Sequence, residues 1–207
     1  MSAIDKLVSA ITPPVSEEKR QKAHARARAE ARPGGWLSLI LDHHEAIAQG
    51  FSEVRAAPDA HTRRLAEKRL GTLLTGHTMA EEAVVYPALA QVHEQGHANK
   101  AYTEQAAAKQ QMAALETLDP LSQDYLDKLG HLEGAVTHHV FEEENDWFLE
   151  LQTRATTTEN ERIGARYKEE FNRYMGSEAP LPGAAAIRPD LEPRSFTADT
   201  SDRPSLG

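Results

Sequence analysis

Apolar residues recur at intervals of three and four along most of the chain between residues 36 and 175. This spacing places them on one face of an α-helix and predicts helices that each bury one side. The first stripe consists of Leu37, Ile40, Leu41, His44, Ile47, Phe51 and Val54. Comparable stripes, interrupted by proline and glycine, predict helices over about 36–54, 59–93, 98–118, 120–151 and 158–175.

The first four of these helices are long and joined by short turns, which predicts an all-α, up-down-up-down four-helix bundle. We expect residues 34–176 to form this bundle together with a fifth, C-terminal helix whose capping box is Thr158 and Glu161. Asp119-Pro120 is expected to start the fourth helix, and Pro87 to bend the second.

Two segments fall outside the bundle. Residues 1–33 form a predicted N-terminal helical extension, with a short amphipathic helix over 1–12 and a helix from Ser16 to Arg32 that has almost no large apolar side chain. A solvated arm is the simpler interpretation of this second helix, and a docking arm for a protein partner is the alternative. Residues 177–207 are proline-rich and lose all periodicity, which is typical of a disordered or surface-draped tail.

The second helix carries charged and polar groups inside its apolar stripe. His77 and Glu81 are four residues apart and lie on the same face as Leu73, Leu74 and Val84. A polar pair that points into a core costs free energy unless it has partners. A cation is the partner that suits a neutral imidazole and a carboxylate together.

The same pattern recurs 62 positions later in the fourth helix, where His139 and Glu143 also lie on an apolar stripe. The flanking residues match as well, since a second glutamate follows each motif and an aromatic residue, Tyr86 or Phe148, stands at the corresponding place. One such pair is common on helix surfaces. Two copies with matching flanks, both on buried faces, predict a metal site.

Two further positions complete the predicted polar layer of the bundle. His44 lies on the stripe of the first helix, whereas His43 is displaced by about 100° and is expected beside the site, with a role as an additional ligand as the alternative. Gln105 lies on the stripe of the third helix. The predicted metal ligands are His44, His77, Glu81, His139 and Glu143. Two carboxylates on facing helices can bridge two metal ions, and nitrogen and oxygen donors without sulfur suit iron, manganese or zinc.

Composition narrows the function. The chain of 207 residues has a net charge of −9, which argues against nucleic acid as its main partner. Without cysteine it has no disulfide, thiolate ligand, catalytic thiol or iron–sulfur cluster. We find no apolar run of the roughly 20 residues needed to span a bilayer and no secretory signal, so we expect no membrane association and a cytoplasmic location.

Three segments resemble the hemerythrin-like, or HHE cation-binding, family: Leu41–Ile47, His77–Pro87 and His139–Glu144. The resemblance covers roughly residues 36–152. It implies a non-haem centre of two iron ions, bridged by the two glutamates and an oxo or hydroxo group, with manganese or zinc as less favoured metals. Members of the family bind dioxygen, react with peroxide or nitric oxide, or sense oxygen or iron.

One position departs from the family pattern, because Gln105 stands where the third helix normally supplies a histidine. The iron there could keep an open position, or the site could hold a single metal. Alternatively, Tyr102 as a phenolate or Glu104 could replace the histidine, and Tyr102 is the preferred substitute. Other side chains are expected to play supporting roles: Glu82 and Glu144 beside the site or on the surface, Tyr86 and Phe148 in the core, and His24 on the surface.

The sequence leaves three functions open. The first is a dioxygen carrier or sensor, and the second is an enzyme of catalase or peroxidase type that removes hydrogen peroxide. The third is a regulatory protein whose metal only stabilises the bundle. The same metal ligands would serve all three.

Overall fold

The computed structural model of the protein describes residues 15–92 and 95–176. Within these ranges all regular structure is helical, as predicted: α2 (Glu17–Glu30), α3 (Trp36–Ala56), α4 (Ala60–Ala80), η1 (Glu81–Val85), α5 (Tyr86–Val92), α6 (Gln95–Glu116), α7 (Gln123–Glu142), η2 (Glu143–Trp147), α8 (Phe148–Arg154) and α9 (Thr157–Met175). The expected amphipathic helix over 1–12 and the proline-rich tail over 177–207 lie outside the described residues.

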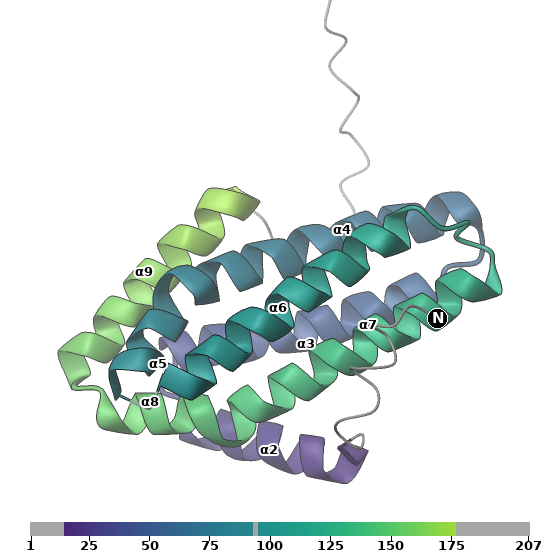
Figure 1. Cartoon of the computed structure of the whole chain (residues 1–207). Helices are drawn as coiled ribbons and strands as arrows, with labels where there is room; N and C mark the ends of the chain where they lie inside the picture. The colour runs from purple at the N-terminus through teal and green to yellow at the C-terminus, as the bar shows by residue number, and fades with distance from the viewer. Residues whose placement is uncertain (1–14, 93–94, 177–207) are drawn as a thin grey trace, which may run out of the picture.

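The long helices α3, α4, α6 and α7 lie side by side and form the predicted bundle (Figure 1). Helix α3 packs against α4 and α7, and α6 packs against α7 and α4. Helix α2 lies along the outside of α7 and η2 and also touches α3, while α9 packs on α4, α3 and η1. No helix in the described part of the chain is long and apolar enough to cross a membrane.

The apolar stripes are buried and form one core. The stripe of α3 is fully inside, from Leu37 to Val54. Trp36 at the start of α3 is 1% exposed, packs edge-on against Phe148, and donates a 2.8 Å hydrogen bond from Nε1 to Oδ1 of Asn160 on α9. This buried hydrogen bond ties α9 to the bundle and makes the fifth helix part of the core rather than an attachment.

Both His-x3-Glu motifs end in a turn of π-helix. Glu81 is the first residue of η1 and Glu143 is the first residue of η2. A π turn holds one residue more than an α turn and rotates the side chains that follow it, and such turns are frequent at functional sites. The sequence predicted only a bend at Pro87. Proline is not the cause, because η2 has the same form and no proline follows it.

Two helix starts differ from the prediction. The capping box of α9 lies two residues earlier than Thr158 and Glu161: the Thr156 hydroxyl accepts from the Glu159 N–H, and the Glu159 carboxylate accepts from the Thr156 N–H. Both threonine–glutamate pairs have the same spacing, so the motif alone could not choose between them. Gly176 ends the helix with a φ of 86°, as expected.

The fourth helix of the bundle begins at Gln123 rather than at Pro120. Ser122 is its N-cap, and its hydroxyl accepts a hydrogen bond from the backbone N–H of Tyr125. Asp119 instead closes the preceding turn by accepting from the N–H of Leu121. The two caps follow each other closely, and the helix starts at the later one.

Glycine at position 134 in α7 offers a test of how the bundle is packed. A Cβ built there meets no atom within 4 Å, so the Gly134→Ala variant gains helix propensity without a clash. We expect the free energy of unfolding to rise by about 0.5–1 kcal/mol in denaturant titrations. Gly71→Ala is the control, because its Cβ would lie 2.9 Å from Cε of Met112 and the gain should be smaller or absent. A Gly134→Ala protein less stable than wild type would contradict the described packing.

Candidate metal centre

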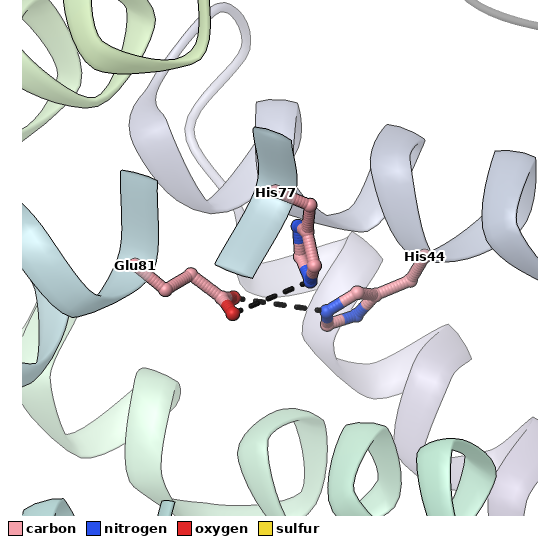
Figure 2. Close-up of side chains that lie close together, drawn as sticks. All are labelled: His44, His77 and Glu81. Atoms are coloured by element: carbon pink, nitrogen blue, oxygen red, sulfur yellow. Dashed lines mark ion pairs between the residues drawn. The ribbon is translucent and has the colours of Figure 1, made fainter. Parts of the chain in front are cut away.

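Three parts of the bundle direct imidazole and carboxylate groups to one point in its core. His44 comes from α3, His77 and Glu81 from the junction of α4 and η1, and the last pair, His139 and Glu143, from the junction of α7 and η2. Two groups of three ligand atoms result, each with all atoms within 4.8 Å of one another: His44, His77 and Glu81, and Glu81, His139 and Glu143. Figure 2 shows the first group, with both imidazoles turned toward the carboxylate.

The structure therefore brings together all five residues that the sequence predicted as ligands, and each is at most 7% exposed. Glu81 belongs to both groups. Its Oε2 lies 3.3 Å from Nε2 of His77, and its Oε1 lies 4.0 Å from Nε2 of His44. Glu143 lies 3.4 Å from Nε2 of His44 through Oε2 and 3.3 Å from Nε2 of His139 through Oε1.

Several buried atoms at this point have no hydrogen-bond partner. They are Nε2 of His44, Oε1 of Glu81, Oε2 of Glu143 and Oε1 of Gln105. A buried acceptor without a partner costs free energy, and an unpartnered carboxylate costs more. All four are atoms that can donate an electron pair to a cation. The donor set of this centre therefore fits a metal ion of the kind that nitrogen and oxygen ligands prefer.

The two carboxylates have opposite pKa shifts. Burial raises the pKa of Glu81 well above its usual value, and the neighbouring charge of Glu143 raises it further. Burial also raises the pKa of Glu143, but His139 and His44 outweigh this effect, and its pKa lies below the usual range. Burial lowers the pKa of His44, yet the hydrogen bond to Glu144 and the nearby charge of Glu143 raise it to about 10. Without a cation, protons must balance the buried charge.

Each of the three imidazoles has a partner for the nitrogen that faces away from the centre. The Nδ1 atoms pair as follows: His44 with Oε1 of Glu144 at 2.8 Å, His77 with the hydroxyl of Tyr167 at 3.1 Å, and His139 with Oε2 of Glu104 at 2.9 Å. Such partners fix the ring orientation and direct Nε2 of each ring toward the centre. Glu104, which the sequence offered as a substitute ligand, instead orients His139.

His43 lies beside the centre, as expected from its displacement on the helix. Its Nδ1 lies 2.7 Å from the hydroxyl of Tyr167, and its ring stacks on Phe171 with centroids 3.9 Å apart. Burial lowers the pKa of His43 to about 3, so this ring is neutral at physiological pH. Tyr167 thus connects His43 and His77, and through it α9 supports the centre.

Tyr86 is the residue that the sequence assigned to the core and that the structure places in the centre itself. Its hydroxyl oxygen lies 2.8 Å from Oε1 of Glu143, 3.2 Å from Oε2 of Glu81 and 3.0 Å from Nε2 of His139. It also accepts a hydrogen bond of 2.5 Å from Nε2 of Gln105. Tyr86 therefore stands among the donor atoms of the second group. One difference in the sequence could have indicated this role, because the matching residue of the other motif is Phe148, so that only the first motif carries a hydroxyl.

Tyr102, the preferred substitute for the missing histidine, does not reach the centre. Its side chain is on the surface, 38% exposed, and its hydroxyl donates to the backbone carbonyl of Glu82 at 2.8 Å. Its ring packs edge-on against Tyr86. Gln105 does reach the centre and donates to Oε2 of Glu81 at 2.7 Å. Gln105, at the position where the family pattern expects a histidine, therefore meets Tyr86 beside Glu81.

His24 on α2, predicted to be a surface or ordinary residue, is half-buried and pairs with two carboxylates. Its Nδ1 lies 3.0 Å from Oε1 of Glu144 and its Nε2 lies 2.9 Å from Oε1 of Glu45. Because Glu144 also pairs with His44, a chain of hydrogen bonds runs from α2 to the centre. Nothing in the sequence connects residue 24 with residue 144, because the contact depends on how α2 lies across η2.

A third group of metal-binding side chains lies nearer the surface, on α6 and α7. It consists of Glu104, His138 and Glu142, all half-buried. The ammonium group of Lys100 pairs with Glu142 and lies 3.6 Å from Oε1 of Glu104. The ammonium group of Lys100 therefore already balances negative charge in this third group.

Comparison with known proteins agrees with this geometry. Residues 37–151, more than half of the chain, match the model of the hemerythrin HHE cation-binding domain. The chain belongs to this family, and the resemblance noted in the sequence is confirmed. No solved structure matches the chain.

One curated relative is a protein named DNA nickase from Nostoc sp. (strain PCC 7120 / SAG 25.82 / UTEX 2576). It is 26% identical over 144 residues, which is 68% of this chain and 41% of the relative. The chain thus spans about two fifths of the length of the relative that it matches.

Neutralising Glu81 should stabilise the metal-free protein against unfolding and should remove the stabilisation that added metal gives. Since burial raises its folded pKa, metal-free wild type loses stability as pH rises from the ordinary carboxyl range to that raised value. We expect Glu81→Gln to remove this loss and to raise the free energy of unfolding of metal-free protein by about 1–3 kcal/mol at alkaline pH. Thermal unfolding with and without added metal measures both effects.

Added metal should stabilise wild type and leave the Glu81→Gln variant unchanged. Glu82→Gln is the matched control, because this neighbouring carboxylate faces Lys109 at 2.7 Å and is outside the centre. Equal stabilisation of both variants by metal would show that Glu81 is not a ligand.

Proposed function

We propose that the chain binds two metal ions at this centre and that the loaded centre binds dioxygen, as a carrier or a sensor. The observation that supports this most is the sharing of Glu81 between two groups of ligands. Unpartnered oxygens on Glu81 and Glu143 give two carboxylates with free electron pairs in one buried volume. That arrangement suits a pair of cations better than a single one, because each carboxylate can contribute one oxygen to each ion.

Iron is the metal that we propose. The donors are imidazole nitrogen and carboxylate oxygen, and among the metals that accept this set, zinc has no redox chemistry. Two ferrous ions held here would supply the electrons for reversible binding of dioxygen. An oxo or hydroxo bridge between them is expected from the family. Manganese remains the second choice.

The protein's own groups would perform three tasks. Burial of the whole centre excludes bulk water and strengthens every charge interaction within it. Glu144, Tyr167 and Glu104 hold the imidazoles in orientation through their Nδ1 atoms. In the metal-free protein, the hydroxyl of Tyr86 holds a proton between the carboxylates of Glu81 and Glu143, and a cation can displace that proton.

Tyr86 also supports a more specific assignment. In the metal-free protein, burial raises its pKa well above 10, and the charges of Glu143 and Glu81 raise it further. A bound cation reverses this effect, because it stabilises a phenolate in the same place. We therefore propose Tyr86 as the further ligand that replaces the missing histidine, in the role that the sequence assigned to Tyr102.

The nickase activity belongs to the relative, of which the chain spans only about two fifths. With a net charge of −9, this chain lacks the overall positive charge that favours phosphate binding. We keep the prediction that nucleic acid is not its partner. Incubation of the metal-loaded protein with supercoiled plasmid tests it directly, because nicking that depends on Glu81 would refute it.

The main experiment is metal analysis combined with absorption spectra. Protein produced in iron-replete medium should contain two iron ions per chain, and its reduced form should change colour reversibly as air and argon are exchanged. The Glu81→Ala variant should lose most of its iron, because Glu81 belongs to both groups of ligands.

Other outcomes of the same experiment select the other functions. Oxygen evolution from hydrogen peroxide, without reversible binding, would favour a peroxide-removing enzyme. Tightly bound zinc, with no reaction toward dioxygen or hydrogen peroxide, would favour a regulatory protein stabilised by metal. Wild-type protein without bound metal would reject the proposal.

Tyr86 and Tyr102 form a matched pair for the ligand assignment. The ferric protein should show a phenolate-to-iron absorption band in the visible range, which disappears in Tyr86→Phe and persists in Tyr102→Phe. Both substitutions remove one hydroxyl, but only that of Tyr86 lies among the donor atoms. If the band persists in Tyr86→Phe, Tyr86 is not a metal ligand and acts only as a hydrogen-bond donor.

A further inference from the structure

A pocket of about 330 Å³ lies between α2, α3 and α7. Its walls include the side chains of Ile47, Ala48, Phe51, Val136, Val140 and Phe141. His44 and Glu144 also line it, so the pocket reaches one of the five predicted ligands and the carboxylate that orients it. Neither of two further pockets, among α5, α8 and α9 and beside α7, is lined by any of the five.

The walls and the size of this pocket indicate what it can hold. An apolar cavity of roughly 150 Å³ is enough for a benzene molecule or a xenon atom, so this pocket exceeds what a diatomic molecule needs. The carboxylates of Glu17, Glu45 and Glu133 also line it, and each is paired with an arginine: Arg20, Arg28 and Arg55. Apolar walls beside charges that already have partners favour an uncharged molecule, because a charged one would be buried without a partner of its own.

Helix α2 covers the pocket and is held mainly by polar contacts. Within it only Ala23 and Ala27 are buried. Arg28 pairs with Asp42 at 2.6 Å and with Glu45 at 2.7 Å, on the flank of α3. Exposed ion pairs contribute little to stability, and segments with few buried apolar contacts open locally at low cost. Helix α2 also precedes the part of the chain that matches the family domain.

We propose that this pocket is the entry site for a small uncharged molecule such as dioxygen on its way to the metal centre, and that α2 is its movable cover. This inference rests on the proposed function, since it assigns the path to that centre. His24 at the pocket wall connects the cover to the centre through Glu144 and His44. The chain's N-terminal arm thereby becomes part of the oxygen site.

Xenon tests the pocket without any need for metal. Crystals of the full chain under xenon pressure should show a xenon atom against Phe51 and Val140. Ala48→Trp places a large ring at the exposed edge of the pocket and should abolish this binding. Ala88→Trp is the matched control, because Ala88 lines the separate pocket among α5, α8 and α9. Absence of xenon from wild type would overturn the entry site.

Rapid mixing of reduced, iron-loaded protein with dioxygen tests the path. Ala48→Trp should slow association severalfold, with unchanged iron content and an unchanged final spectrum, whereas Ala88→Trp should react as wild type does. An unchanged rate in Ala48→Trp would overturn the path and leave the metal proposal intact. Wild-type protein that binds no iron would instead reject the proposed function. The xenon result would still show whether the pocket binds a small uncharged molecule.

The role of α2 has its own pair of variants. Arg28→Ala removes the contacts to Asp42 and Glu45, whereas Arg26→Ala removes only the pair with Glu30 within the same helix. Hydrogen exchange over residues 17–30 should accelerate in Arg28→Ala, and dioxygen should associate severalfold faster. Faster exchange in Arg28→Ala with an unchanged association rate would overturn the role of α2 as a cover.

Discussion

The structure depends on a concentration of charge in the middle of an apolar bundle. Two carboxylates and three imidazoles converge where water is excluded, and Glu81 and Glu143 each keep one oxygen without a partner. Two buried carboxylates cost free energy unless positive charge balances them, and either bound protons or a cation can supply that charge. The opposite pKa shifts of Glu81 and Glu143 express this cost in the absence of metal. Compensating positive charge, from protons or from a cation, is therefore a condition that the core itself imposes.

Hydrogen bonds connect the imidazoles of the centre to the surrounding helices. The nitrogen of each imidazole that faces away from the centre pairs with a group from a different element: Glu144 on η2, Tyr167 on α9 and Glu104 on α6. Tyr167 and Glu144 extend the network to the helices outside the bundle, α9 and α2. Neither helix is one of the four long helices of the bundle, yet both support the candidate metal centre.

The two π turns explain how a repeated motif produces an asymmetric centre. Glu81 and Glu143 begin equivalent turns, and equivalent aromatic residues follow five positions later. Tyr86 reaches the centre with its hydroxyl and meets both carboxylates, whereas Phe148 packs against Trp36. The asymmetry lies on the side where Gln105 replaces a histidine. A phenol and an amide stand there, which gives the two halves of the centre different chemistry.

The sequence by itself determined the helices, the bundle and the five converging residues, because helical periodicity fixes which side chains share a buried face. It also placed His43 beside the centre. Only the tertiary structure decided between Tyr86 and Tyr102, since a π turn and the packing of α6 direct the first inward and the second to the surface. It alone brought His24 to Glu144, across 120 residues of chain. Periodicity is local, whereas these contacts depend on how separate helices lie against one another.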